Sequence, residues 1–258
     1  GMVLAGETTD TVVFSSSQAA VAVWSPPTTA TRPPSEITPA TTPATTPANS
    51  PKPSDWGDRS SRPSKRAANQ AFAEAVADVD PSAFSATDRG VILYLEEHEG
   101  ATTKAVLQEQ HNPSTLLRLV AVNSNPSVTR ALAQNLDDRE LRCTGLFTGR
   151  LNDAVSTLTD QPVAGVFLDF CGNLTVAKKG MEAPLHDLSR CLHSLQFVPG
   201  AALAITVCQR SSKPVLSSQA AQTTIEQVVC GTYPAAVMVQ QLSYHPTMLF
   251  LLFRLHRE

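Results

Sequence analysis

The sequence has little charge and few aromatic side chains for its length. Charged residues make up 17% of the 258 residues and aromatic residues only 5%. The formal net charge is −3, from 20 Lys and Arg against 23 Asp and Glu. A chain without a strong positive field cannot hold a polyanion over its whole surface. The composition therefore argues against a protein dedicated to coating nucleic acid.

Long apolar runs and a disulfide framework are also missing. No apolar run is longer than Met248–Phe253, which is far short of the roughly 20 residues that cross a bilayer. Ala19–Trp24 has no basic flank of the kind found in signal peptides. The five cysteines are odd in number and widely spaced, which is typical of buried thiols in a reducing compartment. We therefore expect an intracellular protein, cytoplasmic or nuclear, with no membrane partner.

The first 66 residues have the composition of a disordered tail. Pro, Ser and Thr make up more than half of Ser25–Arg66, and the stretch TPATTPATTPA repeats a four-residue unit. Such a segment buries too little apolar area to offset its chain entropy. It closes with basic residues that we interpret as solvated, namely Lys52, Arg59, Arg62, Lys65 and Arg66. We expect residues 1–66 to be disordered and to offer a place for a protein partner.

Residues 67–258 carry the pattern of a doubly wound α/β domain, which opens with a helix at Ala67. Five short apolar runs alternate with helical stretches: Val91–Leu95, Leu117–Val122, Cys143–Thr148, Val163–Leu168 and Ala201–Val207. One of the helices, marked by Leu185–Leu195, is expected to close at Pro199-Gly200. Two last runs, Ala235–Leu242 and Met248–Leu255, are joined too tightly for a crossover helix and must be antiparallel. The sequence predicts three layers: a mostly parallel, seven-stranded sheet with an antiparallel C-terminal strand, and helices on both faces.

Polar residues follow the carboxyl ends of the predicted strands. Ligands of doubly wound sheets bind at this edge, which selects Glu96, Asn123, the corner Thr148–Leu151 and Asp169. Asp169 ends the most continuously apolar of the strands, where a carboxylate is costly unless it has partners. We therefore expect Asp169 to have a functional role.

The order of elements, ending in an antiparallel hairpin, resembles that of the seven-stranded, Rossmann-type S-adenosylmethionine-dependent methyltransferases. The resemblance covers residues 67–258 and includes a divergent glycine-rich loop. On the stretches LYLEEHEGATT and AVNSN it implies cofactor contacts from Glu96, Gly100, Thr102, Thr103 and Asn123. On TGRL and LDFCGN it implies further cofactor contacts from Arg150, Leu151, Asp169 and Phe170. It also implies that Asp169 and Cys171 are catalytic.

The residues of this set suit the implied cofactor. A sulfonium favours carboxylate and aromatic neighbours, ribose hydroxyls need paired hydrogen-bonding groups, and methyl transfer needs in-line positioning. Only Gly100 stands where the family usually has two or three glycines, and Asn123 stands where it has an acid. These departures leave open a catalytically inactive methyltransferase fold that serves as an interaction module. The methyl acceptor is left open between RNA, protein and a small molecule.

Other chemistries fit parts of the same sequence. VFLDFCGNLT resembles the first motif of haloacid-dehalogenase-type phosphatases, with Asp169 as nucleophile, but Cys171 replaces the second acid and no paired-acid motif for magnesium follows. Cys171 also fits thiolate attack on a pyrimidine ring, as in cytosine-C5 methyltransferases, or a small buried thiol at a turn. His98 is expected to be a solvated loop residue. His186 and His193 lie too far apart on one helix to share a metal ion, so we expect no metal site.

Overall fold

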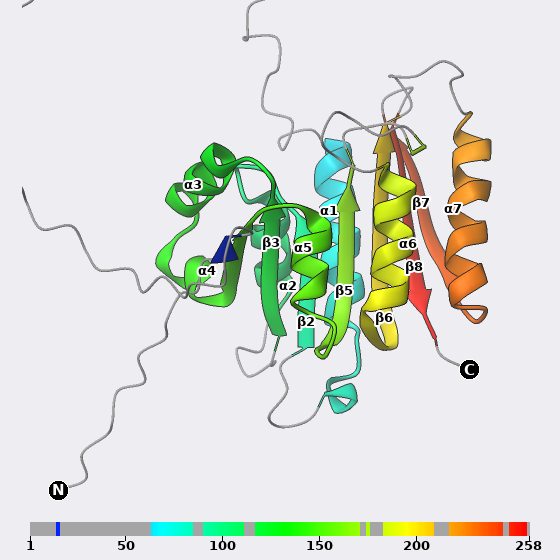
Figure 1. Ribbon diagram of the computed structural model, residues 1–258, viewed down its shortest axis with the longest axis horizontal. Helices are drawn as coiled ribbons and strands as arrows, with labels where there is room; N and C mark the ends of the chain where they lie inside the picture. The colour runs from blue at the N-terminus through cyan, green and yellow to red at the C-terminus, as the bar shows by residue number, and fades with distance from the viewer. Residues whose placement is uncertain are drawn as a thin grey trace, which may run out of the picture.

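The computed structural model describes residues 63–84, 90–110, 117–170, 174–175, 183–208, 217–244 and 248–256, together with the backbone of residues 14–15 (Figure 1). One mixed sheet runs through the chain in the order β1-β4-β3-β2-β5-β6-β8-β7. Its parallel central strands are β2 (Gly90–Leu95), β3 (Leu117–Asn123), β4 (Thr144–Thr148), β5 (Pro162–Asp169) and β6 (Gln196–Cys208). At one edge, β8 (Met248–Leu255) runs antiparallel to both β6 and β7 (Val237–Tyr244). These seven strands confirm the predicted sheet and its antiparallel C-terminal strand.

Helices cover both faces of the sheet (Figure 1). On one face lie α1 (Pro63–Ala77) and α2 (Ala101–Glu109), which pack against each other. On the other face lie α5 (Leu151–Ser156) and α6 (Pro184–Ser194), with α7 (Ser218–Thr232) packed beside α6. The connection from β3 to β4 carries α3 (Pro126–Asn135) and α4 (Asp138–Cys143). The three-layer architecture is therefore as predicted.

The chain departs from the expected boundaries at its N-terminal side. Helix α1 begins at Pro63, four residues before Ala67, and so includes the last part of the segment that we expected to be disordered. The two-residue strand β1 (Phe14–Ser15) lies within the same segment and pairs with β4. The remaining tail residues lie outside the described part of the chain.

One additional helix and one helix end also differ from the sequence prediction. Helix α4 was not expected, and it is set by a capping box in which Asp137 and Glu140 bond each other's backbone N–H groups. Helix α6 ends at Ser194, so the expected closure at Pro199-Gly200 is wrong. That dipeptide instead lies inside β6, where the pairing with β5 shifts register and Gly200 adopts φ +78°. Glycine accepts this left-handed backbone without the steric cost that other residues have.

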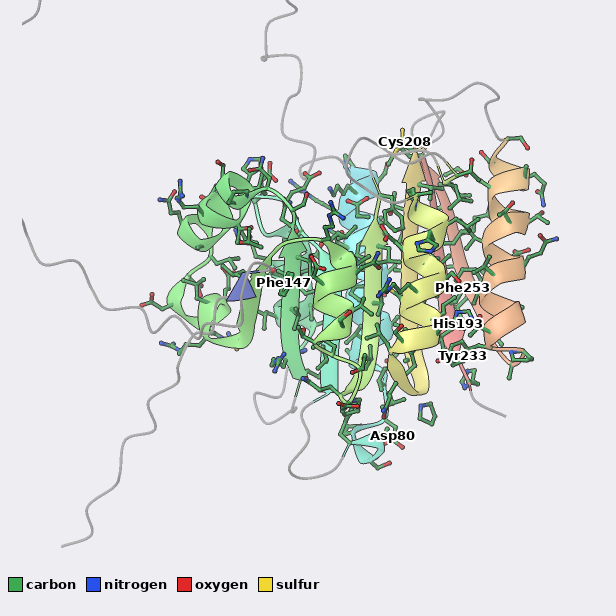
Figure 2. The ribbon with its side chains drawn as sticks, in the orientation of Figure 1. Asp80, Phe147, His193, Cys208, Tyr233 and Phe253 are labelled. Carbon is green, nitrogen blue, oxygen red and sulfur yellow. The ribbon has the colours of Figure 1, made fainter. Side chains whose placement is uncertain are left out.

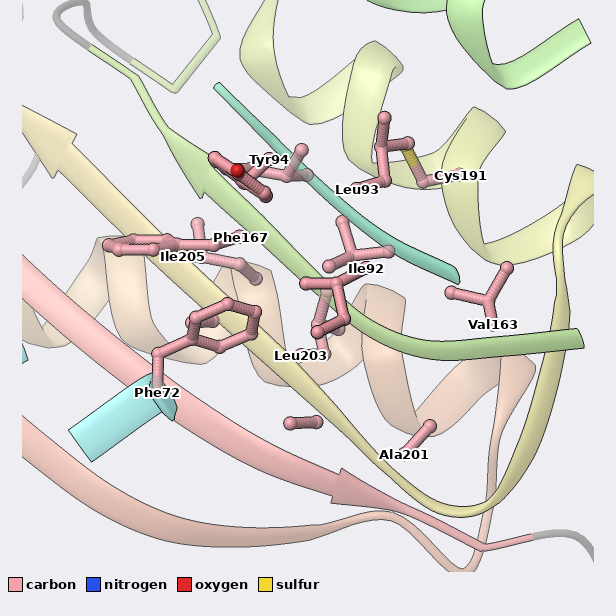
Figure 3. Close-up of a cluster of buried hydrophobic side chains, with 14 of the residues drawn as sticks. Phe72, Ile92, Leu93, Tyr94, Val163, Phe167, Cys191, Ala201, Leu203 and Ile205 are labelled. Atoms are coloured by element: carbon pink, nitrogen blue, oxygen red, sulfur yellow. The ribbon is translucent and has the colours of Figure 1, made fainter. Parts of the chain in front are cut away.

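The core fixes α1 over β5. Phe72 of α1 packs against Phe167 of β5 with tilted rings whose centroids are 5.2 Å apart, and Phe167 meets Phe250 of β8 edge-on at 5.9 Å. A Cβ at Gly165 would lie 2.7 Å from a methyl group of Val76, so the missing side chain lets the helix approach the strand. Figure 3 shows Phe72 packing on the sheet from α1 and Cys191 packing on its other face from α6. Aromatic pairs of this kind add to the free energy gained from apolar burial.

The described cysteines are less buried than the sequence suggested. Cys191 is fully buried, and burial raises the pKa of its thiol. Cys143 and Cys208 are half-buried and Cys230 is exposed, so the expectation of buried thiols holds for Cys191 alone among these four. Figure 2 shows Cys208 at the carboxyl end of β6. Within the described ranges, no helix combines the length and the apolar character needed to cross a membrane.

Candidate functional site

The sheet changes winding direction between β2 and β5. From β2 the chain moves outward to β3 and β4, then returns to β5 on the other side of β2 and continues to β6. Doubly wound sheets bind ligands at such a switch point, in the crevice outside the carboxyl ends of the strands. Here the residues at that point are Glu96, which follows β2, and Asp169, the last residue of β5.

Glu96 caps the first turn of α2. The residue is 4% exposed, and its Oε2 accepts hydrogen bonds from the backbone N–H of Thr103 at 2.8 Å and from the Thr103 hydroxyl at 3.0 Å. The residue at the N-cap, Gly100, has φ +68° and no side chain with which to cap the helix. Glu96 thus occupies the position at the α2 N-terminus where an anionic ligand group would otherwise be favoured.

This carboxylate belongs to a buried polar chain. The Tyr94 hydroxyl lies 2.8 Å from Thr103 Oγ1, and both Thr102 and Thr103 are buried. Burial raises the pKa of Glu96 to about 7, although its hydrogen bonds to Thr103 and Glu97 and the nearby Lys65 charge act in the opposite direction. Burial also raises the pKa of Tyr94. Glu96 therefore changes charge near neutral pH while it holds the loop in place.

Asn123 ties the ends of β2 and β3 together. Its Nδ2 donates to the carbonyl of Glu96 at 2.7 Å, and its Oδ1 accepts from the N–H of Asn125 at 2.8 Å. Its own carbonyl accepts from Gly149 N–H at 3.1 Å, which brings the corner after β4 beside it. At that corner Arg150 is exposed and Leu151 is buried.

Lys65 joins the two sides of the switch point. Its Nζ lies 2.9 Å from Oδ2 of Asp169 and 3.5 Å from Oε1 of Glu97. The side chains of Lys65 and Asp169 are only 14% and 12% exposed, so the ion pair is largely shielded from water. The interpretation of Lys65 as part of a solvated tail is therefore wrong.

The position of Lys65 follows from the face of α1 on which it lies. Lys65, Asn69, Phe72 and Val76 follow one another at helical spacing, and the last two face β5. This spacing, together with Pro63 at the first helical position, is the sequence signal from which the earlier start of the helix could have been predicted. The segment before Pro63 is rich in Pro and Ser, and for this reason residues up to 66 were assigned to the tail.

Two buried oxygen atoms lie near this ion pair. Asn69 Oδ1 and Thr206 Oγ1 have no hydrogen-bond partner among the described residues. Asn69 is one helical turn from Lys65, and Thr206 pairs in register with Asp169, so its side chain is on the same face of the sheet. A bound water or a donor group of a ligand would satisfy these two atoms.

The structure gathers most of the expected site residues at one edge. Glu96, Thr103 and Asn123 form one hydrogen-bonded group, and Gly100 and Thr102 lie beside it at the start of α2. Lys65 links Asp169 to Glu97, the neighbour of Glu96. Phe170 is 7% exposed, and its N–H continues the strand ladder to the carbonyl of Thr206. Cys171 lies outside the described residues.

Two other expectations concern the exposure of His98 and the presence of a metal site. His98 is 54% exposed and pairs with Glu99 at 3.0 Å, which confirms its place in a solvated loop. Among the described residues, no group of three His, Cys, Asp or Glu side chains is arranged to hold a metal ion.

Methyltransferases are among the solved structures that this chain resembles. The fibrillarin pre-rRNA processing protein of Methanococcus jannaschii has a TM-score of 0.50 and 13% identity, over 66% of this chain and 68% of that one. An rRNA methylase from Streptococcus thermophilus has a TM-score of 0.48 and 15% identity, over 76% and 98% of the two chains. The N-methyltransferase NodS from Bradyrhizobium japonicum has a TM-score of 0.46 and 13% identity, over 76% and 99%. Comparison of the sequence with protein-family models and with curated proteins gives no match.

Proposed function

Because the chain has the fold of the Rossmann-type S-adenosylmethionine-dependent methyltransferases, we propose that it binds S-adenosylmethionine at the switch point and transfers its methyl group beside Asp169. The observation that carries this proposal is the ion pair of Asp169 with Lys65. It shows a shielded carboxylate at the carboxyl end of β5 that holds a cation. The sulfonium of the cofactor is also a cation and benefits from the same carboxylate.

The neighbouring residues suit the rest of such a cofactor. An amide has two N–H groups and two lone pairs, and the bonds of Asn123 within the described residues use one of each. The others are available to ribose hydroxyls, and Leu151 at the adjoining corner offers an apolar contact to a base. The N-terminus of α2 is already occupied by Glu96, so we propose that the carboxylate of the cofactor is held elsewhere.

The role of the protein in this reaction would be mainly one of placement. The cofactor supplies the methyl group, and methyl transfer needs the acceptor atom in line with the bond that breaks. Asp169 would orient the charged centre, and the first turn of α1 would cover it from the solvent. Asn69 and Thr206 offer buried acceptors to the N–H or O–H of an acceptor group. RNA, protein and small molecules all present such groups.

One observation favours a second candidate, a catalytically inactive interaction module. The polar groups of Glu96, Asn123 and Asp169 already have partners inside the chain. A site whose charges are satisfied internally is stable without a ligand. In this case the fold would present a surface to a protein partner, with the N-terminal tail as a recruiting segment.

Calorimetric titration with S-adenosylmethionine and S-adenosylhomocysteine tests the choice between these functions. The methyltransferase proposal expects saturable one-to-one binding of both ligands to the full chain. It also expects weaker binding of S-adenosylmethionine to Asp169→Asn. The absence of binding of either ligand at millimolar concentration would favour the interaction module.

A further inference from the structure

Lys65 is held between two carboxylates that belong to opposite sides of the switch point. Glu97 follows β2 and Asp169 ends β5, and the ammonium of Lys65 contacts both. The loop after β2 brings further acids to this edge, namely the buried Glu96 and the half-buried Glu99. This edge is therefore a place where the protein favours positive charge, and its own lysine supplies it.

Helix α1 determines where that lysine lies. Phe72 and Val76 pack on β5, and further along the helix Arg254 of β8 donates to the carbonyl of Ala75 and pairs with Asp78 at 3.0 Å. These contacts pin the helix to the sheet over several turns. Lys65 is part of the chain, so its ammonium stays beside Asp169 whatever the concentration of cations in solution.

We propose that Lys65 sets the preference of the site between S-adenosylmethionine and S-adenosylhomocysteine. The inference rests on the proposed function, because it concerns the ligands of that site. The two molecules differ at one centre, where the first has a sulfonium and the second a neutral thioether. Only the sulfonium competes with the ammonium of Lys65 for Asp169 and is repelled by it. Lys65 therefore disfavours the methyl donor relative to the demethylated product.

The test compares both ligands on three variants of the full chain by calorimetry. Lys65→Met removes the charge and keeps an apolar stem of similar length, whereas Lys65→Arg keeps the charge. Lys104→Met is the matched control, because it removes the same charge from an exposed lysine of α2 that bonds the carbonyl of Glu99 at 3.0 Å. Lys65→Gln, whose amide can still donate to Asp169, makes the same comparison if Lys65→Met does not fold.

The expected result is selective. Lys65→Met should bind S-adenosylmethionine at least tenfold more tightly than the unsubstituted chain, with S-adenosylhomocysteine changed by less than threefold. Lys65→Arg and Lys104→Met should keep the original ratio of the two affinities. An equal change for both ligands would overturn the inference, since it would mark Lys65 as a structural residue. Weaker binding of S-adenosylmethionine would also overturn it. Binding of neither ligand, with or without Lys65, would instead reject the proposed function itself.

Discussion

The carboxylate of Asp169 and the ammonium of Lys65 lie 2.9 Å apart, although one ends a central strand and the other belongs to the first helix. The pair connects α1 to the carboxyl end of β5 at the point where the sheet changes winding direction. The pair is partly buried, so each charge compensates the other where water does so only in part, and Glu97 also compensates Lys65. Substitution of Asp169 can separate the effect of this ion pair on ligand binding from its effect on the free energy of unfolding.

Asp169→Asn should abolish methyl transfer and lower the affinity for S-adenosylmethionine. The asparagine can still accept a hydrogen bond from Lys65, so we expect the free energy of unfolding to fall by only about 1 kcal/mol. Urea unfolding measures that loss, and transfer of labelled methyl groups measures the activity. Asp160→Asn, at an exposed turn, is the control and should change neither. Unchanged binding and transfer in Asp169→Asn would exclude Asp169 from the site.

Glu96 should make the stability of the protein depend on pH. Its pKa is raised to about 7 in the folded chain from an ordinary value of 4.5. The folded state therefore binds the proton more tightly than the unfolded state, and stability falls as the pH rises from 4.5 through about 7. The full loss is on the order of 3 kcal/mol.

Urea unfolding of the protein and of Glu96→Gln at several pH values measures this effect. The glutamine stays neutral and can still accept from Thr103, so the variant should lack the Glu96 part of the slope. Parallel pH profiles for the two proteins would show that Glu96 is not the titrating group.

Gly100→Ala should destabilise the protein more than Gly200→Ala does. Both glycines have positive φ, which costs a non-glycine residue roughly 1–2 kcal/mol. A Cβ at Gly100 would also lie 2.6 Å from Leu136 Cδ2, whereas a Cβ at Gly200 would meet nothing within 4 Å. The difference between the two variants in thermal or urea unfolding isolates the clash, for which we expect about 1–3 kcal/mol. Equal losses would mean that Leu136 moves away freely.

Asn123→Ala should weaken both the loop and the binding of the cofactor. It removes the hydrogen bonds to the Glu96 carbonyl and from the Asn125 N–H, which should lower the free energy of unfolding by about 1–2 kcal/mol. The affinity for S-adenosylhomocysteine should fall by a similar amount if the side chain also bonds the ribose. Asn135→Ala, which removes an exposed bond to the carbonyl of His98, is the matched control. A loss of stability with unchanged affinity would limit Asn123 to a structural role.

The sheet was predictable because its strands leave a local signal. Val163–Leu168 is continuously apolar, and a strand buried on both faces needs that composition. The tight link between the last two strands likewise fixed their antiparallel pairing. Helix α4 was not predicted because it is short. The only sequence signal for it is its capping box, Asp137 with Glu140.

The polar contacts of the site were less predictable because they depend on tertiary structure. The position of Asp169 at the end of a strand predicted a functional role for it. No residue near Asp169 in the sequence indicates that Lys65 is its partner. Glu96 follows a strand and would by default be exposed in a loop, yet the N-terminus of α2 draws its carboxylate inward. Such contacts depend on how the elements pack together.

The measurement that tests the central claim most directly is thermal unfolding of the full chain with increasing S-adenosylhomocysteine. A ligand at 100 times its dissociation constant adds about 2.7 kcal/mol to the stability of the folded state. The account predicts a saturable rise in the unfolding temperature, which Asn123→Ala reduces and Asn135→Ala leaves intact. An unfolding temperature that does not change up to millimolar ligand would contradict the claim that this fold binds the methyltransferase cofactor.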